Sequence, residues 1–469
     1  PDGPTGPIIF GSRSGKQQDK PNERAGGIGR MGKFQKRRVF VVGVGMTKLT
    51  KPKKDESEGP HFPELGQTAV ERALEDACLS DKRHLIESAH VGCMFNVGAG
   101  QRVLYGLPGG PIMGIPISNL NNACATGSHA FALARQSVMS GVNDCALALG
   151  VEKMKPGSLG GGGGGGPSSI DNHFKVMVES QGMPKTIPMA AFFGGAGLQH
   201  NKLYGSTPEH FAKIGEKNHR HSVNNPYAQF RDEYTLEEIK ASPAVFPLGD
   251  GGALTKLQCS PTSDGAAAVI VASEEFVIEH GLQGQAVEIL GQGLRTDSPT
   301  VFDAPDKRRS MIEVVGFGMA SEAAAMAYKE AGITPDQVDV VELHDCFSCN
   351  ELLTYEALGL AKVGEGHKLV DSGDNTFGGK YVINPSGGLI SKGHPLGCTG
   401  ASHVAEICWQ LRGECGPRQV QDAKIGMNHN LGLGGLVCVN IFKRPDEWRS
   451  IPMKRKQSLA MGPPPSAKL

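Results

Sequence analysis

Apolar and polar positions follow one order twice along the chain. The first half predicts a strand, a helix, a strand, a helix and two strands at 39–47, 67–79, 88–95, 124–141, 145–153 and 265–273. The second half repeats this series at 287–296, 320–333, 338–347, 397–413, 424–432 and 434–442. In both halves the first strand, VFVVGVGMT or VEILGQGLRT, is expected to lead into a glycine-rich turn. The pattern predicts a duplicated βαβαββ unit.

Alternating strands and helices predict an α/β protein in which helices pack on the faces of mixed sheets. The helices expected at 124–141 and 397–413 are apolar nearly all round, which is typical of buried helices. Two such helices between two sheets would give a five-layered αβαβα sandwich.

Residues 154–256 interrupt the repeat. They include seven successive glycines at 160–166, without the Gly-Lys-Ser/Thr of a phosphate-binding loop, and a helical pattern at 207–223. A long insertion at this place predicts a loop domain that covers the site rather than a linker. The expected domains are an N-terminal arm 1–35, a first half 36–153 completed by 257–275, the loop domain 154–256, a second half 276–446 and a tail 447–469.

Composition narrows the functional classes. The 469 residues carry 48 Lys and Arg against 48 Asp and Glu, a balance that disfavours a general nucleic-acid-binding protein. The sequence contains no run of about 18 consecutive apolar residues, so no membrane span is predicted. The 11 cysteines are scattered through apolar segments, as expected of buried thiols in a reducing compartment rather than of a disulfide scaffold.

Both ends of the chain contain candidate targeting signals. Residues 1–35 are rich in glycine, proline and basic residues, which indicates a flexible arm or a targeting segment. The last residues, Ala467-Lys468-Leu469, are similar to the Ser-Lys-Leu peroxisomal address. They predict a peroxisome or a related organelle such as a glycosome, with the peroxisomal import receptor as a partner. A mitochondrion is the alternative, because the N-terminal arm is basic.

The first chemical candidate is Cys124, in NNACATGSHA at the start of a predicted buried helix. Helix N-termini offer free N–H groups and positive potential, and both lower the pKa of a thiol. Cys124 is therefore placed like a nucleophile. The alternative is a small buried cysteine at a helix cap.

A second candidate, His394, lies between Gly393 and Pro395 just before the other buried helix. Histidine is the natural base for a thiol near neutral pH. The alternative is a structural histidine that satisfies carbonyls of the turn. The glycine-rich turn NHNLGLGG, 428–435, is suited to presenting backbone N–H groups to an oxyanion, or is a tight hairpin that needs glycine.

The segment VELHDCFSCNE, 341–351, places His344, Asp345, Cys346 and Cys349 at the end of a predicted strand. A zinc site needs further Cys/His pairs, and a second CxxC is missing, so metal and disulfide chemistry are both disfavoured. By the internal symmetry, Cys346 falls near the position of Cys93. This strand end would then face the starts of both buried helices, where catalytic groups belong.

These motifs together resemble the thiolase superfamily: the Cys124 segment, GHPLGCTG at 393–400, HDCF at 344–347 and the last glycine-rich turn. HDCF is similar to the fingerprint of the sterol carrier protein 2-type thiolases, and the resemblance covers about residues 36–446. It implies reversible, CoA-dependent thiolysis of a 3-oxoacyl-CoA to acetyl-CoA or propionyl-CoA and a shortened acyl-CoA. Coenzyme A would be the co-substrate, with no tightly bound cofactor and no metal, in a homodimer or homotetramer.

The resemblance also implies a role for each site residue. Cys124 would form the acyl-thioester, and His394 would accept its proton and help to bind the thioester oxygen. Cys346 would be the second acid/base, and His344 would donate to the enolate oxygen. The backbone amides of Cys124 and Gly432 would form the second oxyanion hole.

One departure distinguishes this chain from classical thiolases, which place the second catalytic cysteine in a Cys-x-Gly turn of the last loop. Here that turn reads Asn430-Leu431-Gly432. The acid/base thiol would therefore come from HDCF, as in the sterol carrier type, with Cys349 as a packed neighbour.

The family also implies where CoA binds. The insertion 154–256 would hold the CoA moiety, and Ser260 matches a position that contacts the pantetheine. Four basic residues could meet the CoA phosphates, although a solvated helix face is the alternative for each: Lys213, Lys217, Arg220 and Arg231.

Two other functional classes stay open. A related condensing synthase also uses a cysteine at a helix start, but it normally lacks the pair of GHP and HDCF motifs. A non-catalytic acyl-CoA- or lipid-binding protein of thiolase shape would have no need of two thiols.

Overall fold

The computed structural model describes residues 36–55, 58–156, 168–303, 309–455 and 458–462. The predictions for the basic arm, the glycine run and the Ala-Lys-Leu ending fall outside these residues. The elements described below all belong to the unit Arg37–Leu469.

Two series of elements follow one another along this unit. The first half contains β1 (Val39–Met46), α1 (Phe62–Asp76), β2 (Ser88–Gly92), α2 (Ala99–Leu104), β3 (Ile117–Leu120), α3 (Thr126–Met139), β4 (Cys145–Glu152), β7 (Gly265–Ser273) and α8 (Glu274–Glu279). The second half contains β8 (Val287–Arg295), α9 (Pro299–Phe302), α10 (Met311–Val314), α11 (Phe317–Ala331), β9 (Val340–Glu342), α12 (Ser348–Ala357), α13 (Gly366–Ser372), β10 (Val382–Ile383), α14 (Thr399–Arg412), β11 (Ile425–Leu431) and β12 (Val437–Lys443).

Strand order confirms the predicted duplication. The first half has the order β1-β7-β4-β2-β3, and the second half has the equivalent order β8-β12-β11-β9-β10. Four strands of each half match the predicted ones, whereas β3 and β10 were not predicted. These strands have only 4 and 2 residues, which is too short for a visible alternation of apolar and polar positions.

The two halves join edge to edge. β1 pairs antiparallel with β8 through Phe40 with Glu288 and Val41 with Val287. Hydrogen bonding therefore makes one ten-stranded sheet where two separate sheets were expected. This pairing satisfies backbone groups that two edge strands would otherwise leave open.

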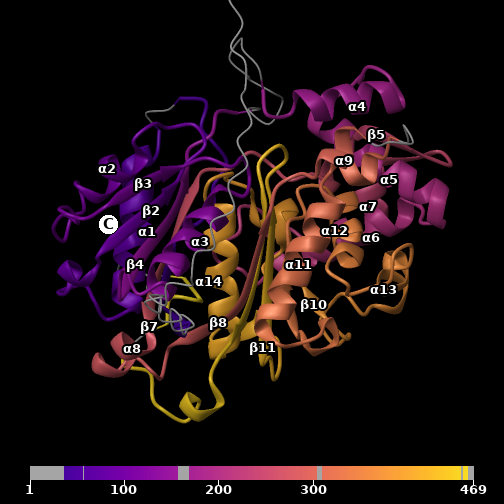
Figure 1. Cartoon of the computed structure of the whole chain (residues 1–469). Coiled ribbons are helices and arrows are strands. Elements are labelled where there is room, and N and C mark those ends of the chain that lie inside the picture. Colours follow the sequence, from indigo (N-terminus) through magenta and orange to yellow (C-terminus); the bar gives the residue numbers. More distant parts are fainter. Residues whose placement is uncertain (1–35, 56–57, 157–167, 304–308, 456–457, 463–469) are drawn as a thin grey trace, which may run out of the picture. The chain divides into compact units, whose positions relative to one another are not determined.

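Helices form three layers around the two halves of the sheet (Figure 1). α1 packs on β1 and β7, and α11 packs on β8 and β12. α3 and α14 contact each other, and α14 touches strands of both halves, so this pair lies between them. Every residue of α14 is buried. The predicted αβαβα layering is confirmed.

The glycines expected in turns after the first strands lie inside the strands instead. Gly43 and Gly45 belong to β1, and Gly291 and Gly293 belong to β8. A Cβ at the first pair would collide with the backbone of α1, and one at the second pair would collide with the backbone of α11. Glycine is needed here because the outer helices lie directly against these strands.

The insertion between β4 and β7 forms helices and a hairpin: α4 (Asp171–Gln181), α5 (Pro188–Tyr204), α6 (Pro208–Ser222), α7 (Leu236–Ala241), β5 (Ala244–Gly249) and β6 (Gly252–Thr255). The helix predicted at 207–223 is thus present as α6. α5 and α6 both contact α12 of the second half. The expected domain boundaries stay predictions. Among the described residues, no helix is long and apolar enough to cross a bilayer.

Candidate active site

Three loops meet between the two halves. The nucleophile loop (121–126) joins β3 to α3, the HDCF loop (344–347) follows β9, and the GHP loop (393–395) precedes α14. The Sγ atom of Cys124 and one ring nitrogen each of His344 and His394 lie within 4.8 Å of one another. The two imidazole centroids are 5.0 Å apart, and their planes meet at 78°. The structure thus brings three predicted site residues together.

A tight turn presents Cys124 just before α3. Ala123 has a φ of 50°, a left-handed conformation that is unfavourable for a residue with a Cβ. The Thr126 hydroxyl holds this turn, because it accepts from the Asn122 amide at 2.7 Å and donates to the Ala123 carbonyl at 2.6 Å. Strain that is held in place by neighbouring contacts is common at functional turns.

The Cys124 thiol is neutral in this resting structure. Burial raises its pKa to about 12, although its own backbone N–H acts in the opposite direction. The side chain keeps part of its surface exposed, yet burial by the surrounding protein is still the largest influence on the pKa of the thiol. The expected lowering by the start of α3 is therefore wrong: desolvation outweighs the helix terminus. The thiol needs a base.

His394 is placed to be that base. Its Nδ1 lies 2.7 Å from the Thr399 hydroxyl, which donates its only hydrogen to the Pro395 carbonyl at 3.0 Å. With the hydroxyl hydrogen on the Pro395 carbonyl, Nδ1 carries the ring proton, and Nε2 keeps a lone pair that can accept the proton of the Cys124 thiol. Burial and the charge of Lys392 lower the pKa of His394 to about 3, so the ring is neutral. This pairing accounts for the cluster, and no metal is assigned to it.

His344 lies opposite His394 in the same site. Burial, together with the neighbouring His394, His429 and His403, lowers the pKa of His344 well below its usual value. This ring is therefore neutral too. Its backbone carbonyl accepts a hydrogen bond from the side-chain amide of Asn350, which holds the HDCF loop to the first turn of α12.

Cys346 supplies the second thiol. Burial raises its pKa well above the usual range, and the nearby thiols and Asp345 act in the same direction. Its carbonyl accepts from the Ser260 amide at 2.8 Å, which places Ser260 in the wall of the site. Cys349 is buried and would touch a Cβ at Gly197 of α5, so it packs behind the site.

Asp345 ties the HDCF loop to the GHP loop, a role that the sequence did not suggest. Its carboxylate accepts from the backbone amides of Leu389 at 2.6 Å and Ile390 at 3.3 Å, and from the side-chain amide of Asn218 at 2.8 Å. The two backbone amides belong to the π-helical turn Gly388–Lys392, which leads into the GHP loop. A Cβ on the first residue of this turn would collide with the carboxylate. The Gly-Gly pair before the GHP motif was the available signal.

Glu152 has a similar part in the first half. It is buried at the end of β4 and accepts from the amides of Met94 at 2.9 Å and Gly397 at 3.0 Å, and from the Cys93 thiol at 3.2 Å. Gly397 lies just before α14. One carboxylate therefore fastens a loop of the first half to the start of the second half's buried helix.

Gly432 differs from its predicted role as a free oxyanion donor. Its amide donates to the Leu436 carbonyl at 2.8 Å and closes the turn between β11 and β12. Glycine is required there for another reason, because a Cβ would collide with the Asn122 carbonyl and the Ala125 amide of the nucleophile loop. Gly432 supports that loop from behind.

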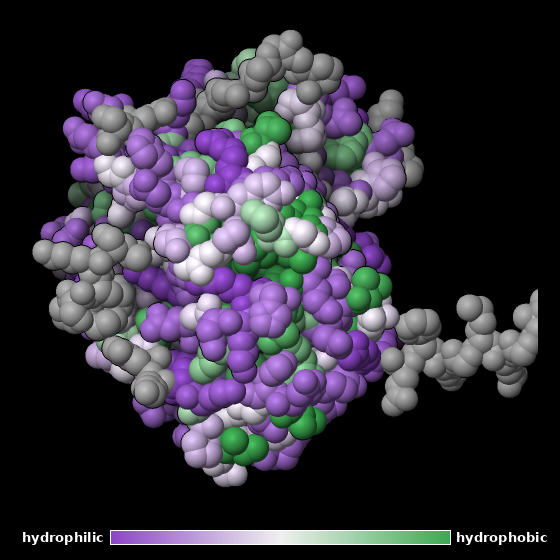
Figure 2. Space-filling model, turned by 90° about the vertical axis from the view of Figure 1, so that its left-hand side faces the viewer, coloured by the Kyte–Doolittle hydropathy of each residue, from purple (hydrophilic) through white to green (hydrophobic). Residues whose placement is uncertain are grey.

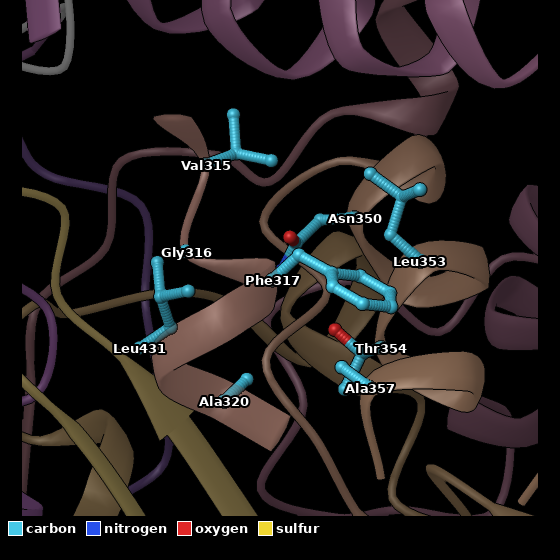
Figure 3. A pocket seen from close by; sticks show the side chains of 9 residues that line it. All are labelled: Val315, Gly316, Phe317, Ala320, Asn350, Leu353, Thr354, Ala357 and Leu431. Carbon is cyan, nitrogen blue, oxygen red and sulfur yellow. The ribbon is translucent and has the colours of Figure 1, made fainter. Parts of the chain in front are cut away.

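The site opens into an apolar cavity of about 50 Å³. Its lining includes Cys124, His344, Cys346 and His394, together with Met189, Phe193, Ser260, Phe347, Leu431 and Leu433. Phe193 of α5 stacks on Phe347, with ring centroids 5.2 Å apart. A second cavity of about 10 Å³, enough for one water, is also lined by Leu431 and lies between α11 and α12 (Figure 3).

The four basic residues considered for CoA phosphates have partners within the protein. Lys217 is buried and pairs with Glu351, so its predicted contact with CoA is wrong. Lys213 and Arg220 form ion pairs with acidic neighbours, and Arg231 donates to a backbone carbonyl. These three reach the surface, and their part in CoA binding stays a prediction, as does that of Ser260.

Comparison with known proteins gives matches along most of the chain. Residues 39–234 match the family model "Thiolase, N-terminal domain", and residues 306–441 match "Thiolase C-terminal domain-like". The chain is 53% identical over 408 residues to sterol carrier protein 2 of Homo sapiens, covering 87% of this chain and 72% of that protein. It is 33% identical over 423 residues to an acetyl-CoA acetyltransferase of Methanothermobacter thermautotrophicus, covering 87% of this chain and 100% of that protein. The solved human mitochondrial 3-ketoacyl-CoA thiolase shares the fold, with a TM-score of 0.62 and 20% identity over 87% of this chain and 98% of that one.

Proposed function

Because the chain belongs to the thiolase superfamily, in its sterol carrier protein 2 type, we propose that it cleaves 3-oxoacyl-CoA with coenzyme A. The products are acetyl-CoA or propionyl-CoA and a shortened acyl-CoA, and the reverse Claisen condensation uses the same groups. One observation carries the proposal: two thiols and two histidines line a single apolar cavity. Acyl transfer needs an activated nucleophile, and carbon–carbon chemistry needs an acid/base and a donor to the enolate.

In the first step the Cys124 thiol gives its proton to Nε2 of His394, and the thiolate attacks the 3-oxo carbon. The C2–C3 bond breaks, and the acyl group stays on Cys124 as a thioester. The electron pair of the broken bond becomes the enolate of acetyl-CoA. Cys346 protonates C2 while His344 donates to the enolate oxygen. The raised pKa of Cys346 keeps its proton available for this step.

In the second step coenzyme A enters with its own thiol. The Cys346 thiolate takes the proton of that thiol, and the CoA thiolate attacks the acyl group on Cys124. The bond to Cys124 breaks, and the His394 imidazolium returns its proton to the Cys124 sulfur. Over the cycle one proton moves from CoA to C2 of the product. Every protein group is restored, so the cycle uses CoA as co-substrate and no tightly bound cofactor.

We expect a homodimer or homotetramer, because the first half offers a surface for contact between copies. β3 is an edge strand, and the segment around it exposes Phe95, Val97, Tyr105 and Met113. Figure 2 faces this side and shows apolar surface gathered between polar regions. Unpaired strand edges and exposed apolar groups are typical of interaction surfaces. Light scattering that finds only monomer would contradict this expectation.

A second candidate function is acyl-CoA or lipid binding without catalysis. The apolar cavity and the name of the human relative support it. A related condensing synthase is a third possibility, since it would also acylate Cys124. The three differ in one reaction: only a thiolase consumes free CoA to split the carbon–carbon bond of a 3-oxoacyl-CoA.

The decisive experiment is acetoacetyl-CoA thiolysis, followed as loss of the 3-oxoacyl absorbance. Cys124→Ala should abolish turnover, and Cys346→Ala should abolish it while Cys124 still becomes acylated. Cys349→Ala is the matched control, because it removes a buried thiol three residues away and should leave turnover unchanged. A wild-type protein inactive on both short and long substrates would favour the binding function. Full activity of Cys346→Ala would refute the two-thiol mechanism.

A further inference from the structure

Asn430 makes a contact that the mechanism above does not use. It occupies the position that matches the second catalytic cysteine of classical thiolases, and it is fully buried on β11. Its Oδ1 accepts from the Ser128 hydroxyl of α3 at 3.1 Å, and its Nδ2 lies 3.0 Å from Nδ1 of His344. Gly400 of α14 leaves room for this chain of contacts, because a Cβ at that position would overlap the Ser128 hydroxyl.

The direction of these hydrogen bonds determines where the proton of His344 lies. With the Asn430 amide oriented as the structure has it, Oδ1 faces a hydroxyl donor and Nδ2 faces the imidazole. An amide nitrogen can only donate, so Nδ1 of His344 must accept. The single proton of the neutral ring is then on Nε2.

We propose that Asn430 is a positioning residue that holds His344 as the Nε2–H tautomer, the form that can donate to the enolate oxygen. This inference rests on the proposed thiolase function. It also gives the two histidines opposite tautomers. Thr399 leaves a lone pair on Nε2 of His394, whereas Asn430 leaves a hydrogen on Nε2 of His344. Two neutral rings 5.0 Å apart thereby act as one base and one donor.

In the part of the chain that the structure describes, no other side chain is hydrogen-bonded to a ring nitrogen of His344 and could set its tautomer. The ionisable groups that act on the ring are the histidines His394, His429 and His403, and the Cys124 thiol lies within reach. The histidines all disfavour a charged ring, and the thiol is protonated. These neighbours keep the His344 ring neutral. The Asn430 amide then determines whether the ring carries its hydrogen on Nδ1 or on Nε2.

Asn430→Asp reverses the hydrogen bond with almost no change of shape. At low pH the Asp–His pair holds an extra proton, and Nε2 of His344 keeps its hydrogen. As pH rises, that proton leaves, the carboxylate retains the hydrogen on Nδ1, and Nε2 becomes a lone pair. The rate of carbon–carbon cleavage should therefore fall with rising pH, by about 10²-fold between the limits, as for loss of one oxyanion donor. The wild type should lack this titration.

A second readout separates positioning from general damage. Exchange of labelled CoA into acetyl-CoA requires acyl transfer at Cys124 but no enolate, so it should stay within about twofold of wild type in Asn430→Asp. Asn428→Asp is the matched control: it also places a carboxylate on β11, but Asn428 bonds to Asn440 and not to His344. It should show neither the new titration nor the split between the two reactions.

The outcomes are distinct. A wild type that cleaves acetoacetyl-CoA while Asn430→Asp keeps the same pH profile, or loses exchange and cleavage equally, overturns the inference alone. A wild type without cleavage overturns the proposed function. If Asn430→Asp does not fold, Ser128→Ala takes its place, because it frees the Asn430 amide to turn over. Its ratio of cleavage to exchange should then drop several-fold, and an unchanged ratio overturns the inference.

Discussion

Asp345→Ala tests how the two catalytic loops are held together. The carboxylate accepts three hydrogen bonds, two from the π-helical turn that leads to His394 and one from Asn218. Each buried donor left without a partner costs about 1–3 kcal/mol. Part of this is offset, because burial and Glu351 raise the pKa of Asp345 and so disfavour its charged form. We expect a net loss of about 3 kcal/mol.

That loss has a measurable size. A chain of 469 residues has an unfolding entropy of about 1 kcal/mol/K, so Tm should fall by about 3 °C. Turnover of acetoacetyl-CoA should fall further, by about 10²-fold, because the turn that leads to His394 loses its anchor and small displacements of catalytic groups are costly. Circular dichroism melting and initial rates measure the two effects.

The matched control is Asp339→Ala. This half-buried carboxylate also accepts from two backbone amides, those of Lys424 and Ile425, at 2.8 and 2.9 Å, but it immediately precedes β9, at the end of the strand opposite to the HDCF loop. Water can replace it, so we expect about 1 kcal/mol of destabilisation and unchanged turnover. The reasoning is refuted if Asp345→Ala melts within 1 °C of wild type, or if both variants keep the wild-type rate.

Three further predictions follow from the site. Leu431→Ala should merge the two cavities that Leu431 lines and raise the kcat/KM ratio of 3-oxooctanoyl-CoA to acetoacetyl-CoA about tenfold; an unchanged ratio would show that the acyl chain runs elsewhere. Because the pKa of Cys124 is raised to about 12, its alkylation by iodoacetamide should rise with pH throughout pH 6–9, and a plateau below pH 8 would indicate a thiolate–imidazolium pair instead. Lys217→Met should lower Tm by breaking the buried pair with Glu351, while KM for CoA stays within twofold; a large rise in KM would restore Lys217 as a CoA ligand.

The sequence by itself determined the two halves, the buried helices and the three loops that carry chemistry. These features depend on patterns that a single segment displays: apolar periodicity, small residues at helix starts, and motifs such as GHPLGCTG and HDCF. Each pattern specifies how a segment buries its own side chains. The repeat also predicted that Cys124, His344 and His394 meet, because the strand end that carries HDCF was expected to face the starts of both buried helices.

Only the tertiary structure decided the packing, the ion pairs and the pKa values of these residues. The glycines of β1 and β8 look like turn residues until the outer helices are in place against them. Lys217 looks like a surface charge until Glu351 is buried beside it. Likewise, the helix start predicts a lowered pKa for Cys124, whereas the protein around the thiol raises it.

Asn430 shows the physical reason most directly. Its partners Ser128 and His344 lie 302 and 86 positions away in the chain. Proton positions, pKa values and close backbone approaches depend on which groups surround an atom in space. Local periodicity contains no information about such distant neighbours, and it therefore predicted the loops that form the site but not the hydrogen bonds that set their protons.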